Sequence, residues 1–288
     1  MARRAGRIMS ALPRASRALA LAVSLILEGA VAQAGPPERV VSINLCTDQL
    51  AMMLAMPGQL ISVSHIAADP LASVMAHEAA RYRLNYGQAE EVHAMAPDLV
   101  LAGPYTSRYT VGLLRRLGVE VRELPVAERL SDIPQTIALM GEWLANGARA
   151  ETLAAEFRAG LAALAPNNDE RPRAVLHYAN NYTSGSQTLA HQILTFAGFA
   201  NIAEEAGLSG GGTLPMEQLI MLMPDVVISG QRYPGLTRAE DVIDHPAMEA
   251  LRERHAGAAV TDAEWVCGTP AVLSAIARLT ALHDAEGS

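Results

Sequence analysis

Short apolar runs alternate with helical patterns through the first half of the chain. The runs at 39–44 (RVVSIN), 60–64, 99–102 and 119–124 have the length and composition of buried strands. Helical patterns lie between them, and one is expected to begin with Thr47 or Asp48 as its cap and to extend to about Met56. Strands that alternate with helices predict an α/β fold in which helices cover a central parallel sheet.

The second half of the chain repeats this plan. Strands are expected at 173–178, at 226–229 and near Val260, with helices at 215–223, 242–254 and 270–283. The segment 208–213 is rich in glycine and is expected to form a flexible loop. A second parallel sheet of similar construction is therefore predicted.

A sequence repeat relates the two halves. Residues 90–103 (EEVHAMAPDLVLAG) and 217–230 (EQLIMLMPDVVISG) share glutamate, Pro-Asp, an apolar run and glycine at identical offsets. Coincidence is an alternative explanation, since a helix, a turn and a strand recur in every α/β protein. The match in register over the whole stretch favours two similar lobes.

One long helix is predicted between the repeats, at 148–165. It is rich in good helix formers and is followed by Pro166, where a helix should stop. About eighteen residues at 1.5 Å each span roughly 27 Å, although Gly160 within the helix costs about 1 kcal/mol relative to alanine. We expect an α/β lobe at 35–130, a helical linker at 131–166 and a second α/β lobe at 167–288.

The N-terminus has the pattern of a cleavable signal peptide at 1–34. Several arginines precede an apolar run at 18–27, and Ala32-Gln33-Ala34 supplies the small residues of a cleavage site before Gly35. A membrane anchor is the alternative, but the apolar run is too short to span a bilayer comfortably. Export to a periplasm is therefore expected.

Charge and cysteine content refine this picture. The net charge of −8 becomes more negative once the basic leader is removed, which argues against nucleic acid as a partner. The chain has two cysteines, Cys46 and Cys267, and an oxidising compartment favours a disulfide between them, with two separate thiols as the alternative. Such a bridge would close nearly the whole chain and add about 5 kcal/mol of stability by the chain-entropy model.

Aromatic and polar side chains follow the predicted strands, where ligands bind in open parallel sheets. Tyrosine and tryptophan suit a large, partly apolar ligand, although some of these side chains are expected only to pack at strand ends. The candidates after strands are Cys46, His65, Tyr105, Tyr182, Tyr233 and Trp265, and Tyr86 and Thr213 lie just before the repeated helices.

Catalytic motifs are absent from the sequence. It contains no G-x-x-x-x-G-K phosphate loop and no H-E-x-x-H pair, and no G-x-S-x-G run follows a predicted strand as a nucleophile elbow requires. His65 and His177 fall near predicted strand ends and, with carboxylates, are able in principle to bind a bare metal ion; a structural role is the alternative. We predict no catalytic residue, no direct metal site and no intrinsic cofactor.

These features together resemble class III periplasmic substrate-binding proteins. The resemblance rests on the leader, the RVVSIN opening, the repeated E-x6-PD-apolar-G pattern, the helical linker and the TDAEW close at 261–265, and it covers essentially the whole mature chain. It implies two Rossmann-like α/β lobes joined by a single long backbone helix, with the ligand in the cleft between them. Family ligands are iron–siderophore complexes, haem or cobalamin for ABC importers.

The resemblance also implies roles for particular residues. Glu90 and Glu217 match the glutamates that dock onto permease arginines in vitamin B12-binding members, with ordinary solvated residues as the alternative. Tyr86 and Tyr182 match aromatic residues that flank the corrinoid in those members. The position near Cys267 is often an arginine that contacts the ligand, and the cysteine here departs from that pattern. The resemblance also places both cysteines at the cleft. Siderophore-binding members often use arginines for anionic chelates, and those available here are Arg81, Arg83, Arg108 and Arg232. Haem-binding members use a tyrosine ligand, for which Tyr105 is the candidate.

The sequence thus predicts a monomeric periplasmic protein that captures a metal chelate and delivers it to an inner-membrane ABC permease. Two other classes remain open. One is an exported enzyme that uses the same cleft, and the other is a metal-binding sensor or scaffold that kept the fold without transport.

Overall fold

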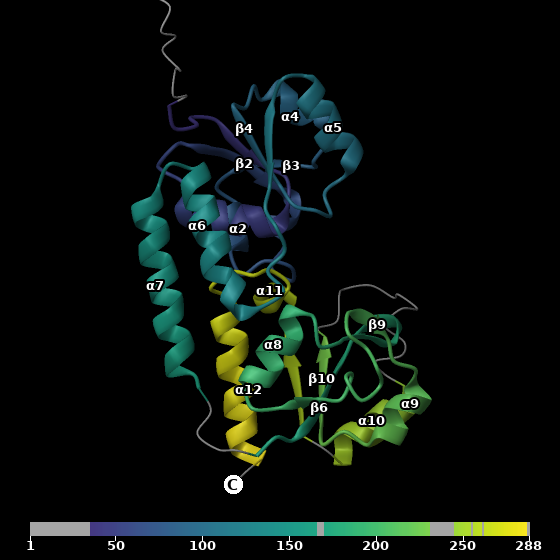
Figure 1. The fold of residues 1–288 in the computed structure, drawn as a ribbon. Coiled ribbons are helices and arrows are strands. Elements are labelled where there is room, and N and C mark those ends of the chain that lie inside the picture. Colours follow the sequence, from purple (N-terminus) through teal and green to yellow (C-terminus); the bar gives the residue numbers. More distant parts are fainter. Residues whose placement is uncertain (1–34, 166–169, 231–244, 255, 261, 287–288) are drawn as a thin grey trace, which may run out of the picture. The chain divides into compact units, whose positions relative to one another are not determined.

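The computed structural model describes residues 35–165, 170–230, 245–254, 256–260 and 262–286. The predicted signal peptide at 1–34 lies outside these ranges. Two parallel sheets, one from each half of the chain, form the framework of the described part (Figure 1). The predicted α/β fold with central parallel sheets is confirmed.

The first sheet has five parallel strands in the order β3-β2-β1-β4-β5. They are β1 (Val40–Ser42), β2 (Leu60–Ser64), β3 (Arg83–Asn85), β4 (Leu99–Ala102) and β5 (Glu120–Glu123). The short edge strand β3 has little apolar character, which is why the hydrophobic pattern did not predict it. The helical segments of this half are α2 (Leu45–Leu54), η1 (His65–Ala68), α3 (Ala76–Ala79), α4 (Ala89–Ala94) and α5 (Arg108–Arg116).

Helix α2 begins earlier than the sequence suggested. The side chain of Asn44 accepts hydrogen bonds from the backbone N–H groups of Cys46 and Thr47, at 3.1 and 3.4 Å, and so caps the helix. The prediction of Thr47 or Asp48 as the cap was therefore wrong. Thr47 and Asp48 lie within the first turn of the helix, and their side chains are buried. They form hydrogen bonds with residues at the ends of β1 and β2 instead.

The second sheet has four parallel strands in the order β11-β10-β6-β8. The strands are β6 (Arg173–His177), β8 (Ala200–Asn201), β10 (Val226–Gly230) and β11 (Ala256–Val260). The helical segments of this half are η3 (Ala179–Asn181), α8 (Leu189–Phe196), α9 (Met216–Leu222), α10 (Pro246–Arg254), α11 (Asp262–Trp265) and α12 (Val272–Glu286). The central order β6-β10-β11 matches β1-β4-β5 in the first sheet.

The glycine-rich segment is not the free loop expected from its composition. Within it, β9 (Gly211–Thr213) pairs antiparallel with β7 (Tyr182–Ser184). Glycine disfavours a strand locally, but here a partner strand from the same half of the chain supplies the hydrogen bonds.

The Pro-Asp of the sequence repeat has the same structural task in both halves. The Asp98 carboxylate accepts the backbone N–H of Arg39 at 3.0 Å, at the start of β1. The Asp225 carboxylate accepts the backbone N–H of Arg173 at 2.8 Å, at the start of β6. Each aspartate thus fixes the start of its own strand beside the start of the neighbouring one.

The glycine that ends each repeat makes room for the residue that follows the neighbouring strand. A β-carbon at Gly103 would lie 3.0 Å from the Asn44 side chain, and one at Gly230 would lie 2.7 Å from the Tyr178 ring. The repeat therefore encodes a strand end that lies close against its neighbour, at the edge where ligands bind.

Two helices, α6 (Ile133–Trp143) and α7 (Gly147–Ala163), connect the sheets and pack along each other (Figure 1). The short 3-10 turn η2 (Leu130–Asp132) precedes α6. Helix α7 matches the predicted backbone helix to within two residues at each end, and its buried residues Ala150, Leu153, Ala154 and Phe157 follow helical spacing along one face.

Gly160 in α7 has a packing role that offsets its cost in helix propensity. A β-carbon at this position would lie 2.7 Å from Cδ1 of Leu273 in α12. The long helix therefore contacts the last helix of the chain closely. The largest apolar cluster includes Leu50, Phe157 and Leu176, so it is continuous from the first sheet through α7 to the second. The lobe boundaries at 130 and 166 remain a prediction.

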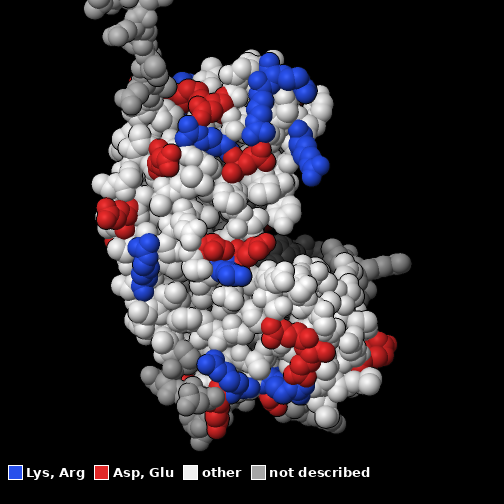
Figure 2. Space-filling view, in the orientation of Figure 1, with Lys and Arg blue, Asp and Glu red and all other residues white. Residues whose placement is uncertain are grey.

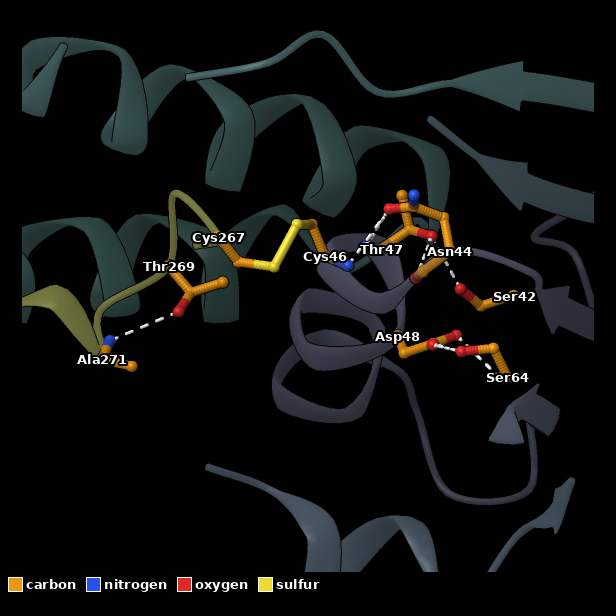
Figure 3. The surroundings of a disulfide bond; sticks show 9 residues. All are labelled: Ser42, Asn44, Cys46, Thr47, Asp48, Ser64, Cys267, Thr269 and Ala271. Atoms are coloured by element: carbon orange, nitrogen blue, oxygen red, sulfur yellow. Dashed lines mark hydrogen bonds between the residues drawn. A yellow bond between two sulfur atoms is a disulfide. The ribbon is translucent and has the colours of Figure 1, made fainter. Parts of the chain in front are cut away.

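A disulfide joins Cys46 in the first turn of α2 to Cys267, which follows α11 (Figure 3). Their Cα atoms are 5.1 Å apart, although the residues are separated by 221 positions. Gly268 next to the bridge lies against the side chain of Ala127. The bond thus ties the end of the first sheet to the segment between β11 and α12.

Asp48 is fully buried, two residues after Cys46 in α2 (Figure 3). Its carboxylate accepts the backbone N–H of Ser64 at 3.1 Å and the hydroxyl of the same residue. Burial raises the pKa of Asp48 from its ordinary value of 3.8 to about 6, although hydrogen bonds from Ser42 and Ser64 act in the opposite direction.

Replacing both cysteines with serine is expected to lower the free energy of unfolding by about 2–5 kcal/mol, because a very long loop is no longer closed in the unfolded chain. Urea denaturation of the oxidised protein and of the double variant measures this loss. Wild-type protein treated with a reductant should behave like the variant. A difference below about 1 kcal/mol would contradict the bridge's role in stability.

The buried carboxyl predicts a pH dependence of stability. Since the folded pKa of Asp48 is raised, the folded state loses stability as pH rises from about 4 to about 6, by roughly 3 kcal/mol. Asp48→Asn keeps an acceptor for the Ser64 N–H and should remove this slope, which makes the variant more stable than wild type at pH 7.5. Denaturation at pH 4.5 and 7.5 checks this, with Asp69→Asn at an exposed position as control; an unchanged slope in the Asp48 variant would refute it.

Candidate ligand-binding cleft

A cavity of about 700 Å³ lies at the carboxyl ends of strands from both sheets. Tyr105 follows β4, Glu128 follows β5, Tyr178 follows β6 and Trp265 follows β11. The described residues that line it are Tyr105, Val126, Ala127, Glu128, Tyr178, Ala179, Tyr182, Ser184, Gln187, Thr188, Leu189, Ala190, Gly210, Gly211, Trp265 and Val266. The location agrees with the rule that parallel sheets bind ligands beyond their strand ends.

Aromatic rings form one wall of this cavity. The ring centroid of Tyr178 is 6.1 Å from that of Trp265, in an edge-to-face arrangement, and 6.2 Å from that of Tyr182. Trp265 is buried, whereas Tyr105 is 88% exposed and free to meet a ligand. These faces provide a broad apolar surface with hydroxyl groups at its edge.

Only some of the predicted site residues line this cavity. Tyr105, Tyr182 and Trp265 line the cavity. Thr213 does not line it but lies opposite Tyr182 in the β7–β9 pair. Tyr233 lies outside the described residues.

Tyr86 and His65 lie together elsewhere on the first sheet. Their rings stack with centroids 4.6 Å apart and planes inclined by 28°. Both side chains are exposed, and neither lines the cavity. They form a separate exposed aromatic pair at the ends of β2 and β3.

The sequence prediction missed several lining residues for identifiable reasons. Tyr178 was counted as the last residue of a strand, but β6 ends at His177 and Tyr178 is the first residue beyond it. The cavity residues Val126, Glu128 and Gln187 lie in connections without aromatic or motif signals. Only the tertiary arrangement brings them to the cavity.

Charge is sparse in the described wall of the cavity. Glu128 is its only Asp, Glu, Lys or Arg residue. The chain contains no lysine, so arginine is its only permanently charged basic side chain. Arg81, Arg83 and Arg108 do not line the cavity, and Arg81 pairs with Glu78 at 2.9 Å. On the face shown in Figure 2, arginines gather over the region of α4 and α5, and acidic side chains with a basic one beside them lie at the inner end of the hollow below.

A smaller cavity of about 280 Å³ adjoins the first one beside the disulfide. Tyr105, Val126, Ala127 and Val266 line both cavities. The other described residues that line it are Asn44, Leu45, Cys46, Thr47, Leu50, Gly103, Pro104, Leu124, Pro125, Thr136 and Gly268. This second compartment is mostly hydrocarbon and carries no charged side chain among these residues.

The described residues do not form a metal centre of their own. No group of three or more His, Cys, Asp or Glu side chains within the described ranges is arranged to hold an ion. His177 is buried, with Nε2 3.2 Å from Oδ1 of Asn181, whereas His65 is exposed against Tyr86. The hypothesis that the two histidines share a metal finds no support in this part of the chain.

Glu90 and Glu217 occupy equivalent positions, each as the second residue of its helix, α4 or α9. Both are exposed, and in the described part of the structure neither makes a hydrogen bond or an ion pair. The neighbouring Glu91 differs, because its carboxylate accepts the backbone N–H of Tyr86 at 2.8 Å. Glu91 therefore stabilises the turn before α4, while Glu90 does not.

Comparisons with known proteins agree with this architecture. A family model described as periplasmic binding protein matches residues 40–256. A vitamin B12-binding protein of Vibrio campbellii is 23% identical over 218 residues, which are 74% of this chain and 78% of that protein.

Two solved structures illustrate the shared fold. A periplasmic haem-binding protein from Roseiflexus sp. RS-1, in its apo form, has a TM-score of 0.71 and 22% identity, over 85% of this chain and 97% of that one. An ABC-type Fe3+-hydroxamate transport protein from Saccharomonospora viridis has a TM-score of 0.65 and 21% identity, over 88% and 94%.

The match runs from β1 to the start of β11 and so includes both sheets and the connecting helices. Among the described helices, none combines the length and apolar character needed to cross a bilayer. The sheets, the cavity at their strand ends and the extent of the match lead to one conclusion: the chain belongs to the periplasmic binding protein family.

Proposed function

We propose that the protein captures a metal chelate or corrinoid in the larger cavity and delivers it to an inner-membrane ABC permease. The observation that carries this proposal is the aromatic-walled cavity of about 700 Å³, which is lined by residues that follow strands of both sheets. A ligand held there contacts both halves of the protein. Its binding energy is then available to stabilise one closed arrangement.

The ligand class is supported by the chemistry of the relatives and by the cavity itself. The relatives described above are named for vitamin B12, haem and Fe3+-hydroxamate. All three are bulky complexes in which the metal already has most of its ligands. Such a complex needs broad contact surface more than a set of protein donors, which agrees with a tyrosine- and tryptophan-rich wall.

Binding without catalysis fits the described wall better than an exported enzyme does. Apart from tyrosine hydroxyls, Glu128 is the only titratable side chain among the described lining residues of the larger cavity. Covalent catalysis requires a nucleophile within hydrogen-bond reach of a base. We therefore infer that the ligand leaves unchanged and that the protein has no cofactor of its own. A sensor or scaffold would share the cavity but not the docking to a permease.

We further propose export through a leader at 1–34 and function in the periplasm as a monomer. Periplasmic location agrees with the family. The basic leader and the apolar run at 18–27 support cleavage before Gly35.

The docking of the protein onto the permease is proposed to use Glu90 and Glu217. The Pro-Asp and the glycine of the sequence repeat are explained by contacts within the sheets. The glutamate is the repeated residue that those contacts leave unexplained, and it is exposed in both copies. Two carboxylates at equivalent positions suit cationic partners on the two halves of a permease and fix the register of docking.

The surroundings of the two glutamates differ, which predicts a preferred orientation on the permease. Beside Glu217, the apolar side chains of Ile220, Met221 and Met223 are exposed, the latter two by 80% and 69%. The equivalent positions after Glu90 carry histidine and alanine. Exposed methionines adapt readily to a partner surface, so the second half of the chain is expected to make the more apolar contact.

The proposed function predicts ligand-dependent stabilisation. Cyanocobalamin, haemin or a ferric hydroxamate should raise the melting temperature of the purified protein, because a ligand that binds only the folded state stabilises it. The absorption spectrum of protein from its native periplasm should show the bands of the bound chelate. If none of these ligands raises the melting temperature, the proposal is wrong.

Tyr105→Ala should weaken ligand binding about tenfold, because a large exposed aromatic face is lost from both cavities. Isothermal titration calorimetry with the stabilising ligand measures the change. Tyr109→Ala provides a matched control, since Tyr109 is 69% exposed and lines neither cavity. Equal effects of the two substitutions would argue against a ligand contact by Tyr105.

Charge reversal of Glu90 and Glu217 to arginine should abolish transport and weaken permease binding more than tenfold, while ligand affinity stays unchanged. Co-purification with the permease in detergent and uptake in cells measure the two effects. Reversal of the exposed Glu151 and Glu249 introduces the same charge change elsewhere. Transport that survives in the first variant would refute the docking proposal.

A further inference from the structure

The charge of the cavity wall restricts the ligand that the proposed function allows. An anionic chelate would lose water on entering the larger cavity and meet Glu128, with no arginine among the described lining residues to compensate. Burying a charge without a partner is costly, and a like charge nearby adds to that cost. A neutral or cationic ligand avoids both effects.

The arginines in β5 and in the segments beside it do not change this balance. Arg122 in β5 pairs with Glu120 at 2.6 Å, and Arg115 pairs with Glu123 at 2.8 Å. Arg129 directly follows Glu128 but does not line the cavity. The described carboxyl ends of the first sheet therefore present one carboxylate and no basic side chain to the ligand.

The shape of the site is as informative as its charge. The smaller compartment opens next to the larger one, and Tyr105, Val126 and Val266 stand where the two share their lining. Val126 and Val266 are 47% and 57% exposed, which is unusual for valine and leaves apolar surface free at the boundary.

The interior of the smaller compartment is apolar and is contributed by distant parts of the chain. Leu45, Leu50 and Leu124 come from the first half, and Val266 comes from the segment after α11. At the packing density of protein interiors, about 280 Å³ accommodates a group on the order of ten non-hydrogen atoms. A body as large as a corrin or a wrapped ferric hydroxamate does not fit there, but an attached ring or alkyl chain does.

We propose that the ligand is a neutral or cationic metal complex in two parts: a body in the larger cavity and an apolar appendage in the smaller compartment beside the Cys46–Cys267 disulfide. This inference rests on the proposed function and specifies it. The aromatic wall holds the body, and the smaller compartment selects for the appendage by shape. The disulfide fixes one side of that compartment, because Cys46 belongs to its lining.

A charge-graded ligand panel tests the first part with the oxidised full-length mature protein. The probes are cyanocobalamin, which is neutral, and ferrioxamine B, which is cationic, against haemin and ferric enterobactin, which are anionic. At least one of the first two should bind at least tenfold more tightly than either anionic probe in calorimetry. Tighter binding of an anionic probe overturns the charge inference but leaves the proposed function intact, whereas no binding by any probe overturns the proposed function itself.

A substitution that fills the smaller compartment tests the second part. Val266→Trp should weaken the tightest probe of the panel at least tenfold, while Val74→Trp should have no effect, since Val74 is 45% exposed and lines neither cavity. If cyanocobalamin is that probe, its dimethylbenzimidazole ring is the appendage, and dicyanocobinamide, which lacks this ring with the rest of the nucleotide, should bind wild type and the Val266→Trp variant with equal affinity. Unchanged binding of the tightest probe to a folded Val266→Trp protein overturns the two-part site.

Discussion

The covalent bond between Cys46 and Cys267 is the constraint on which the cleft depends. It joins the first turn of α2, just beyond β1, to the segment between β11 and α12. The neighbouring Gly268 lies against Ala127, which itself lines both cavities. The bond therefore holds one wall of the smaller compartment against the other, and opening of the cleft at this point would require its reduction.

Packing along the connecting helices also limits separation of the two halves of the chain. Gly160 of α7 leaves room for Leu273 of α12, so these helices are in close contact far from the disulfide in sequence. The apolar cluster through Phe157 is continuous between the sheets. Any separation of the two halves would expose this apolar surface to water, and large hinge motions are therefore unfavourable. Under the proposed function, delivery of the ligand is therefore expected to need only small displacements.

The same arrangement explains why the binding surface has so little charge. The described residues that face the cavity follow strands or belong to the β7–β9 pair and the start of α8, and Glu128 is the only Asp, Glu, Lys or Arg residue among them. Among the described arginines, Arg81 and Arg115 form ion pairs with Glu78 and Glu123 instead of lining the cavity, and Arg232 lies outside the described residues. In the proposed function, the shape of the cavity and its aromatic faces select the ligand, and the negative charge of Glu128 disfavours anions.

The sequence by itself determined the buried strands β1, β2, β4, β5, β6 and β10, the repeat and the long helix, because these depend on local periodicity and on residues close together in the chain. It also placed Tyr105 and Trp265 at strand ends, and both line the cavity. The sequence predicted the wrong cap for α2, because a cap depends on a local hydrogen bond that composition does not specify. It also predicted a flexible loop where β9 pairs with β7, because a strand of glycines depends on its partner strand. Only the tertiary structure decided that Tyr86 and His65 stack apart from the cavity, that Glu128 faces it, and that a second compartment exists beside the disulfide. These features arise from contacts between segments far apart in the chain, and no local pattern encodes them.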